Sequence, residues 1–452
     1  MTDTAPQASS GPGHDVSARR ADAGTVARRL ATLRLGRAAV VAAVAALTTT
    51  ACLGPAGGAR VEPAEASGDG TLRIGLILDN TGAQNFLNAP QQAAAQLAVR
   101  EINAAGGHKG KPVELLPATI SGDTAAQAKA LVAAKADVVI GPTDSSRAPA
   151  AIDVLSAARI AVISPANSAS GLSSYPSKGF YFRTSAADIA QAPVLVKLAK
   201  DGGAATIGVV YEEGSYGKDV ANAVAAAAKA SGLGTAAVVG FAPGQAQQAA
   251  AAVKAAAPDA VVLISRAAAQ GAIAELNNAG VAGKKLILAD GAVNQYGPGL
   301  GSSALDGARG ILPGTFASAK FQGELVSVDP GLKDMAFAAE AYDAVNLAAI
   351  AAAAAQDDAG TSIAAGLVAV SGGSAGTSGG TGPSGAAEVC KSYQECLDTL
   401  RAGKRPDYDG QSGRITFDAH GDVSSANYVL YTYGPDNTAT MSGSETAGSS
   451  GK

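Results

Sequence analysis

Two short turns rich in small polar residues carry the groups best suited to bind an anion. They are Gly141-Pro142-Thr143-Asp144-Ser145-Ser146 and Ser164-Pro165-Ala166-Asn167-Ser168-Ala169. Each follows an apolar, β-branched stretch, and the first opens a predicted helix, where free N–H groups and the helix dipole favour a carboxylate. Asp144 or Ser145 would also suit an ordinary cap of that helix. Two such turns at neighbouring strand ends make an anion pocket more plausible than either turn alone.

Three further side chains follow predicted strands in the second half of the chain. Tyr216 opens a helix and either faces a cleft or packs on the helix start. Arg266 follows the predicted strand 260–264 and is either a cleft-facing cation or a solvated loop residue. Asp290 follows the predicted strand 285–288, where it could bind a ligand ammonium group or act as a turn residue.

The sequence gives little support for a catalytic site, a metal site or a nucleic-acid-binding surface. His108 and His420 lie in glycine-containing turns, where we expect them to be solvated rather than catalytic. Two G-x-S-x-G matches within residues 372–380 lack the strand–turn–helix context that a nucleophile needs. A zinc site would need four ligands, which three cysteines and three histidines supply poorly. The net charge of −4, without a Lys/Arg cluster, argues against nucleic acid. We therefore predict a binding protein, not an enzyme, with no cofactor or metal.

The candidate residues need a scaffold that brings strand ends together, and the hydrophobic pattern predicts one. Apolar strands alternate with helices over residues 71–163 and again over 206–288. Strands without polar alternation are buried on both faces, so each series predicts a parallel sheet covered by helices. The expected fold class is α/β, with two Rossmann-like lobes and an Ala-rich helix over residues 333–355. Ligands in such sheets bind at the carboxyl ends of strands.

The N-terminal residues and the cysteines indicate export. Four arginines between residues 28 and 37 precede a ten-residue apolar run, whereas a membrane-spanning helix needs about 20 residues. Small residues then lead to Cys52, which resembles a bacterial lipobox and predicts acylation of that cysteine. The alternative is ordinary signal cleavage with a free cysteine. In an exported protein, the remaining Cys390 and Cys396 are predicted to form a disulfide.

Short segments along most of the chain carry a resemblance to a known family. In order, they are Ile74-Gly75-Leu76-Ile77-Leu78, Ala98-Val99-Arg100-Glu101-Ile102-Asn103, Val139-Ile140-Gly141-Pro142, Ile163-Ser164-Pro165-Ala166, Phe182-Arg183-Thr184 with Asp188 and Gln191, Tyr216-Gly217, and residues 408–422. Together they resemble the branched-chain-amino-acid-type substrate-binding proteins of ABC importers, which have the type I periplasmic binding protein fold. The resemblance covers residues 71–434.

The resemblance implies two lobes joined by three hinge crossings, which close on a ligand. Lobe 1 is then expected at residues 71–188 plus 317–422, and lobe 2 at 189–316 plus 423–437. Outside the lobes we expect a lipoprotein signal peptide at 1–51, a flexible tether at 52–70 and a disordered tail at 438–452.

In amino-acid-binding members of this family, the ligand carboxylate meets positions matching Ser145, Ala166 and Ser168. The ammonium group meets the position matching Asp290, and an aromatic residue matches Tyr216. Arg266 departs from the pattern, because many members carry a second aromatic residue there. A buried arginine at this position would pair with Asp290 or with a second anionic group on the ligand.

The resemblance thus predicts a monomeric, lipid-anchored receptor on the extracytoplasmic face of the cell membrane. It would capture an amino acid or small carboxylate and deliver it to the permease and ATPase of an ABC importer. The alternative is a lipoprotein that senses its ligand and signals to a partner rather than feeding a transporter.

Overall fold

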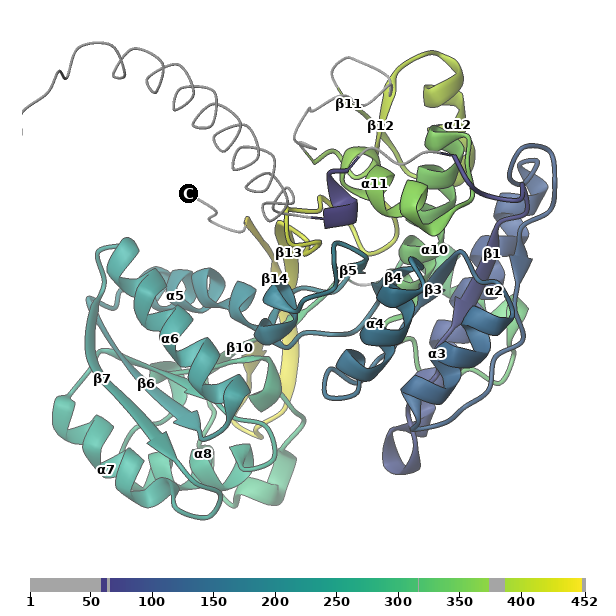
Figure 1. Ribbon diagram of the computed structural model, residues 1–452. Coiled ribbons are helices and arrows are strands. Elements are labelled where there is room, and N and C mark those ends of the chain that lie inside the picture. Colours follow the sequence, from purple (N-terminus) through teal and green to yellow (C-terminus); the bar gives the residue numbers. More distant parts are fainter. Residues whose placement is uncertain (1–57, 63–65, 316, 374–386, 449–452) are drawn as a thin grey trace, which may run out of the picture. The chain divides into compact units, whose positions relative to one another are not determined.

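The computed structural model describes residues 58–62, 66–315, 317–373 and 387–448 (Figure 1). The predicted signal peptide and Cys52 lie outside the described residues, as does most of the Gly/Ser-rich stretch after residue 373. No helix in the described ranges is long and apolar enough to cross a membrane.

The first lobe is built on a five-stranded parallel sheet with the strand order β2-β1-β3-β4-β5. Its central strands are buried on both faces, as their continuous apolar sequences predict. One face packs on α2, α10 and α11, and the other on α3 and α4. The bounds are β1 Arg73–Leu76, α2 Asn88–Ala104, β2 Glu114–Leu115, α3 Thr124–Ala133, β3 Val138–Ile140, α4 Ala148–Ala157, β4 Ala161–Ser164, β5 Tyr181–Arg183, α10 Ala338–Ala355 and α11 Gly360–Val370.

The second lobe contains a seven-stranded sheet with the order β14-β13-β10-β9-β8-β6-β7. Strands β10, β9, β8, β6 and β7 are parallel to one another. Strand β13 pairs antiparallel with β10, and β14 pairs antiparallel with β13; the sequence did not predict these two strands. Helices α5 and α6 cover one face of this sheet, and α7 and α8 cover the other (Figure 1). The bounds are α5 Ala192–Asp201, β6 Thr206–Glu212, α6 Ser215–Ala230, β7 Gly234–Phe241, α7 Ala246–Ala256, β8 Ala260–Ile264, α8 Ala269–Asn278, β9 Leu286–Leu288, β10 Arg309–Pro313, β13 Ser425–Tyr433 and β14 Ala439–Gly448. The α/β prediction with two lobes is confirmed.

The chain passes between the two sheets three times. The first passage follows β5 and ends in the 3₁₀ turn Asp188–Gln191, which leads into α5. The second joins β10 to α9, Ala319–Val328, where the Ser318 hydroxyl caps the helix by accepting the Phe321 N–H at 3.2 Å. The third passage leads from the first lobe into β13.

The Ala-rich helix begins later than predicted. Phe337 has a left-handed backbone conformation (φ 59°), so α10 starts at Ala338 and not at residue 333. Almost every α10 residue is buried, since the helix packs on both α2 and α11. Alanine side chains allow these helices to approach one another closely.

The predicted disordered tail is wrong over residues 439–448, which form β14. This strand pairs with β13 along its whole length, from Ala439 opposite Tyr433 to Gly448 opposite Ser425. The unpaired edge of β13 supplies backbone hydrogen bonds that a mostly polar strand can use. Hydrophobic alternation, the usual strand signal, is weak here because Ala447 alone among the β14 residues is buried.

The flexible tether predicted over residues 52–70 is also wrong where the structure describes it. The N–H groups of Ser67 and Gly68 donate to the carboxylate of Asp357 at 3.3 and 2.9 Å. Those of Asp69 and Gly70 donate to Asp358 at 3.1 and 2.8 Å. Upstream, Ala59 donates its N–H to the carbonyl of Lys178 at 2.9 Å, and the side chain of Arg60 is buried. This N-terminal segment (residues 58–62 and 66–70) is therefore bound to the first lobe.

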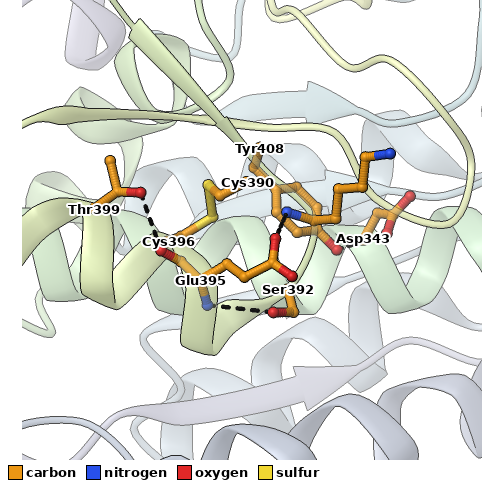
Figure 2. The surroundings of a disulfide bond; sticks show 8 residues. Asp343, Cys390, Ser392, Glu395, Cys396, Thr399 and Tyr408 are labelled. Atoms are coloured by element: carbon orange, nitrogen blue, oxygen red, sulfur yellow. Dashed lines mark hydrogen bonds between the residues drawn. A yellow bond between two sulfur atoms is a disulfide. The ribbon is translucent and has the colours of Figure 1, made fainter.

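The predicted disulfide between Cys390 and Cys396 is confirmed (Figure 2). It links the end of β11, Ala387–Cys390, to the first turn of α12, Tyr393–Arg401. Ser392 caps α12 by accepting the Glu395 N–H at 3.2 Å, and Glu395 accepts the Lys391 N–H at 2.8 Å. Nearby in Figure 2, the hydroxyl of Tyr408, at the end of β12 (Arg405–Tyr408), donates to Asp343 on α10 at 2.8 Å.

Candidate functional site

The loop after β1 is tied to the loop after β3 by a buried carboxylate. Asp79 accepts the backbone N–H groups of Thr143 at 2.8 Å and of Asp144 at 3.1 Å. Burial raises the pKa of Asp79, although these two N–H donors favour the ionised form. Gly141 permits this approach: its φ is +110°, and a Cβ there would lie 2.5 Å from the carbonyl oxygen of Ile77.

The loop after β3 is tied in turn to the loop after β4. The Ser145 hydroxyl oxygen accepts the N–H groups of Ser168 at 3.1 Å and Ala169 at 3.3 Å. The two serine-containing turns identified in the sequence therefore meet, as the rule for parallel strand ends predicts. Because its oxygen is the acceptor in both bonds, Ser145 can still donate its O–H.

The expected helix cap at Asp144 or Ser145 is wrong. Asp144 instead accepts the N–H and the hydroxyl of Ser146, at 2.8 and 2.7 Å, and so closes a separate turn. Helix α4 begins only at Ala148, one residue before Pro149, and proline suits the first turn of a helix. The helix therefore begins three residues after Ser145.

On the second-lobe side, Arg266 lies over Tyr216. Its guanidinium carbon is 3.9 Å from the ring centroid, and its Nη2 is 3.2 Å from Oδ1 of Asp188. Glu212 holds the loop in place by accepting the Arg266 N–H at 2.8 Å and the Ser265 hydroxyl at 2.6 Å. Of the two partners considered for a buried Arg266, Asp290 is not the one used: the side chain is 52% exposed and pairs with Asp188.

The Asp290 carboxylate is hydrogen-bonded to other side chains of the protein. Its Oδ1 accepts the hydroxyl of Tyr216 and the amide Nε2 of Gln191, the latter at 2.7 Å. The next residue, Gly291, packs closely on the loop after β8, because a Cβ on Gly291 would lie 2.6 Å from the carbonyl oxygen of Ser265. Two protein donors therefore already occupy Oδ1 of Asp290.

Asp188 is the acidic residue that the sequence analysis did not place in the site. Its side chain is only 6% exposed. Burial raises the pKa of its carboxyl, and the nearby Arg266 opposes that shift. The sequence feature that could have identified Asp188 is its position in the first passage between the lobes, immediately before the residues assigned to lobe 2.

These side chains surround a cavity of about 620 Å³. Six of the seven predicted ligand-binding residues line it, namely Ser145, Ser146, Ala166, Ser168, Tyr216 and Arg266, and Asp290 does not. The cavity is also lined by residues outside that set of seven, of which Thr143, Asp144 and Ala169 belong to the two serine-containing turns: Asp79, Asn80, Thr81, Gln84, Leu87, Thr143, Asp144, Arg147, Ala169, Ser170, Gly171, Asp188, Ser215 and Asp219.

The expectation that His108 is solvated is wrong. It is only 1% exposed, and neither ring nitrogen has a hydrogen-bond partner among the described residues. Asp358 is the nearest charge, at 3.8 Å from Nε2, and burial lowers the pKa of the imidazole. The tight turn closed by the His108 and Lys111 backbones folds this histidine inward, away from the cavity lining. Among the described residues, no group of three or more His, Cys, Asp or Glu side chains could hold a metal ion.

Comparison with known proteins agrees with this architecture. Residues 71–387 match the family described as periplasmic binding protein. No curated protein matches the chain. The chain is similar to a solved branched-chain amino acid ABC transporter protein from Rhodospirillum rubrum, with 19% identity and a TM-score of 0.63. It is also similar to LivJ from Streptococcus pneumoniae in complex with isoleucine, with 20% identity and a TM-score of 0.55. A third similar structure is a solute-binding protein from R. palustris in complex with 4-hydroxybenzoate, with 16% identity and a TM-score of 0.59. They cover 82%, 84% and 84% of this chain and 100%, 99% and 99% of their own, respectively. The chain therefore belongs to the periplasmic binding protein family and has its type I fold.

Proposed function

We propose that the protein is an extracytoplasmic solute receptor of an ABC importer, which captures an amino acid or small carboxylate and delivers it to a membrane permease. One observation carries the proposal: the cavity is lined by strand-end loops of both lobes. Ser145 and Ser168 belong to the first lobe, and Tyr216 and Arg266 to the second. A ligand that contacts both lobes favours the closed state by the difference in its affinity for the two states.

The serine turns are the best candidates for a carboxylate subsite. Ser145 retains a hydroxyl proton, and the hydroxyls of Ser146, Ser168 and Ser170 line the same wall. The hydroxyl of Ser170 is buried without a hydrogen-bond partner among the described residues. A ligand carboxylate would accept the O–H groups of Ser145 and Ser170 and offset the cost of burying the unpaired Ser170 hydroxyl.

A lipid anchor on Cys52 fits the position of the N-terminal segment. Because Ala59 and Arg60 are already bound to the first lobe, only residues 53–57 and Gly58 separate them from Cys52. Six residues span at most about 20 Å. Such an anchor would hold the receptor close to the membrane that contains its permease.

A thermal-shift screen of the purified protein tests the proposal. The panel contains amino acids, small dicarboxylates and aromatic acids. A ligand at a hundred times its Kd should add about 2.7 kcal/mol to the free energy of unfolding. Ser145→Ala should weaken the response to any carboxylate that stabilises the protein. Ser231→Ala, on an exposed residue after α6 and outside the cavity lining, should leave that response unchanged.

A folded, ligand-free sample that responds to no member of the panel would contradict the proposal. Equal responses of the Ser145→Ala variant and the wild type would remove the serine turns from the carboxylate subsite.

A further inference from the structure

Few large apolar side chains line the cavity. Among the described residues, Leu87 is the only aliphatic side chain larger than alanine in its lining, and Tyr216 is the only aromatic one. The guanidinium of Arg266 covers a face of the Tyr216 ring at 3.9 Å. A branched aliphatic or aromatic ligand side chain would find few large apolar partners here, whereas a hydrophilic one would find hydroxyl, amide and charged groups.

The charges of the lining are unequal, with four aspartates and two arginines. Both arginines are already paired: Arg266 with Asp188 at 3.2 Å, and Arg147 with Asp144 at 3.4 Å. The third carboxylate, that of Asp79, holds two backbone N–H groups and thereby fixes the loops. Among the described residues, each arginine of the lining therefore already has a carboxylate partner.

Asp219 is the remaining charge. Within the described part of the chain, its carboxylate forms neither a hydrogen bond nor an ion pair, although the residue is half-buried. It follows Tyr216 by three positions on α6, so both side chains lie on the same face of the helix. A carboxylate that lines a cavity and has no partner there is available to pair with a ligand cation.

We propose that the cavity selects a small hydrophilic ligand with a cationic nitrogen, an ammonium or guanidinium group, and that Asp219 binds this group. The inference rests on the proposed solute-binding function and names its ligand class. It assigns to Asp219 the role expected of Asp290, whose Oδ1 is occupied by Tyr216 and Gln191. A purely structural role for Asp219 is to interact with the N-terminal end of the α6 dipole. That role would affect stability and not ligand choice.

Isothermal titration calorimetry of the purified protein separates the two roles. The probes are L-arginine and L-lysine, compared with L-isoleucine, L-glutamate and 4-hydroxybenzoate. We expect the cationic amino acids to bind at least about tenfold more tightly than the others. Asp219→Asn should weaken L-arginine binding by at least about tenfold. The control Glu213→Gln removes the same charge from an exposed residue near the start of α6 that does not line the cavity, and it should bind L-arginine as the wild type does.

Tighter binding of L-isoleucine, L-glutamate or 4-hydroxybenzoate would overturn the inference and leave the solute-receptor function intact. Unchanged L-arginine affinity in Asp219→Asn, with only a lowered Tm, would assign Asp219 to the helix dipole and also overturn it. An absence of binding by all five probes would overturn the inference, and the broader thermal-shift panel would then decide the proposed function.

Discussion

The guanidinium of Arg266 reaches the carboxylate of Asp188, 78 positions earlier in the chain, at 3.2 Å. Asp188 stands at the end of the first passage from the first lobe, and Arg266 follows β8 in the second. This pair places a half-exposed cation beside a buried anion at the wall of the cavity. It neutralises Asp188 and covers Tyr216 at the same time.

Arg266→Ala should change which ligands the protein prefers. Removing the cation leaves Asp188 as an additional unpaired carboxylate in the cavity, which favours cationic ligands and disfavours anionic ones. We expect the ratio of the Kd for L-glutamate to the Kd for L-arginine to rise by about tenfold, as for loss of one unit charge from a partly solvated site. Calorimetric titration of both ligands measures the ratio.

Arg266→Lys keeps the charge and is the matched control for that experiment. Its ratio should stay near the wild-type value. If Arg266→Ala leaves the affinity for every ligand unchanged, Arg266 takes no part in ligand choice.

Asp343 on α10 is expected to be one of the most sensitive positions for stability. Its buried carboxylate accepts the N–H groups of Gln411 and Ser412 at 2.9 and 2.7 Å, and the Tyr408 hydroxyl at 2.8 Å. Asp343→Ala leaves these donors buried and unpaired, which should lower the free energy of unfolding by about 3 kcal/mol. Urea unfolding measures the change.

Asp343→Asn keeps one acceptor oxygen in place, so we expect a smaller loss than with alanine. Equal losses for the two variants would show that the packing of α10 on residues 408–412, rather than acceptance of these hydrogen bonds, determines the stability.

The parts of the fold that the sequence predicted share a physical origin. Continuous apolar strands followed by helices require parallel sheets, and parallel strands end at one edge. The meeting of Ser145 with Ser168 and Ala169 follows from that rule alone, because each residue lies just beyond a strand end.

The parts that were missed depend on contacts between distant residues. Asp290 does not line the cavity, and its Oδ1 accepts a hydrogen bond from Gln191, 99 positions earlier; no local sequence pattern predicts such a pair. The strand β14 has mostly polar residues, so only its pairing with β13 identifies it. The binding of residues 67–70 likewise depends on Asp357 and Asp358, nearly 300 positions away.

The hydrogen bonds that hold residues 67–70 should be visible in amide exchange. Replacing both Asp357 and Asp358 by asparagine removes the two charged acceptors of four consecutive N–H groups. We expect the amides of residues 67–70 to exchange at least about tenfold faster, because hydrogen bonds to charged groups are the stronger ones. Hydrogen–deuterium exchange with mass spectrometry measures this rate.

Asp69→Asn provides the comparison, because within the part of the chain that the structure describes the Asp69 side chain binds Thr71 and Arg73 alone. The amides of residues 67–70 should exchange at the wild-type rate in this variant. Unchanged exchange in the double variant would mean that contacts other than these carboxylates hold the segment.

Asp137 should make the protein less stable as the pH rises. Burial raises the pKa of its carboxyl to about 7, and the Asp358 carboxylate adds to the effect. The folded protein therefore keeps this proton up to about pH 7, whereas the unfolded chain releases it near pH 4. Stability from this group is fully present below about pH 4 and is lost as the pH rises to about 7.

Asp137→Asn cannot lose a proton, and its amide oxygen can still accept the Arg73 N–H that Asp137 accepts at 2.8 Å. We therefore expect this variant to be more stable than the wild type at pH 8, with a smaller difference at pH 5. Urea unfolding at the two pH values measures both differences. Asp398→Asn, at an exposed position on α12, is the control and should show no such pH-dependent gain. A variant that is less stable than the wild type at pH 8 would show that Asp137 is ionised in the folded protein and stabilises the start of β1 in that form.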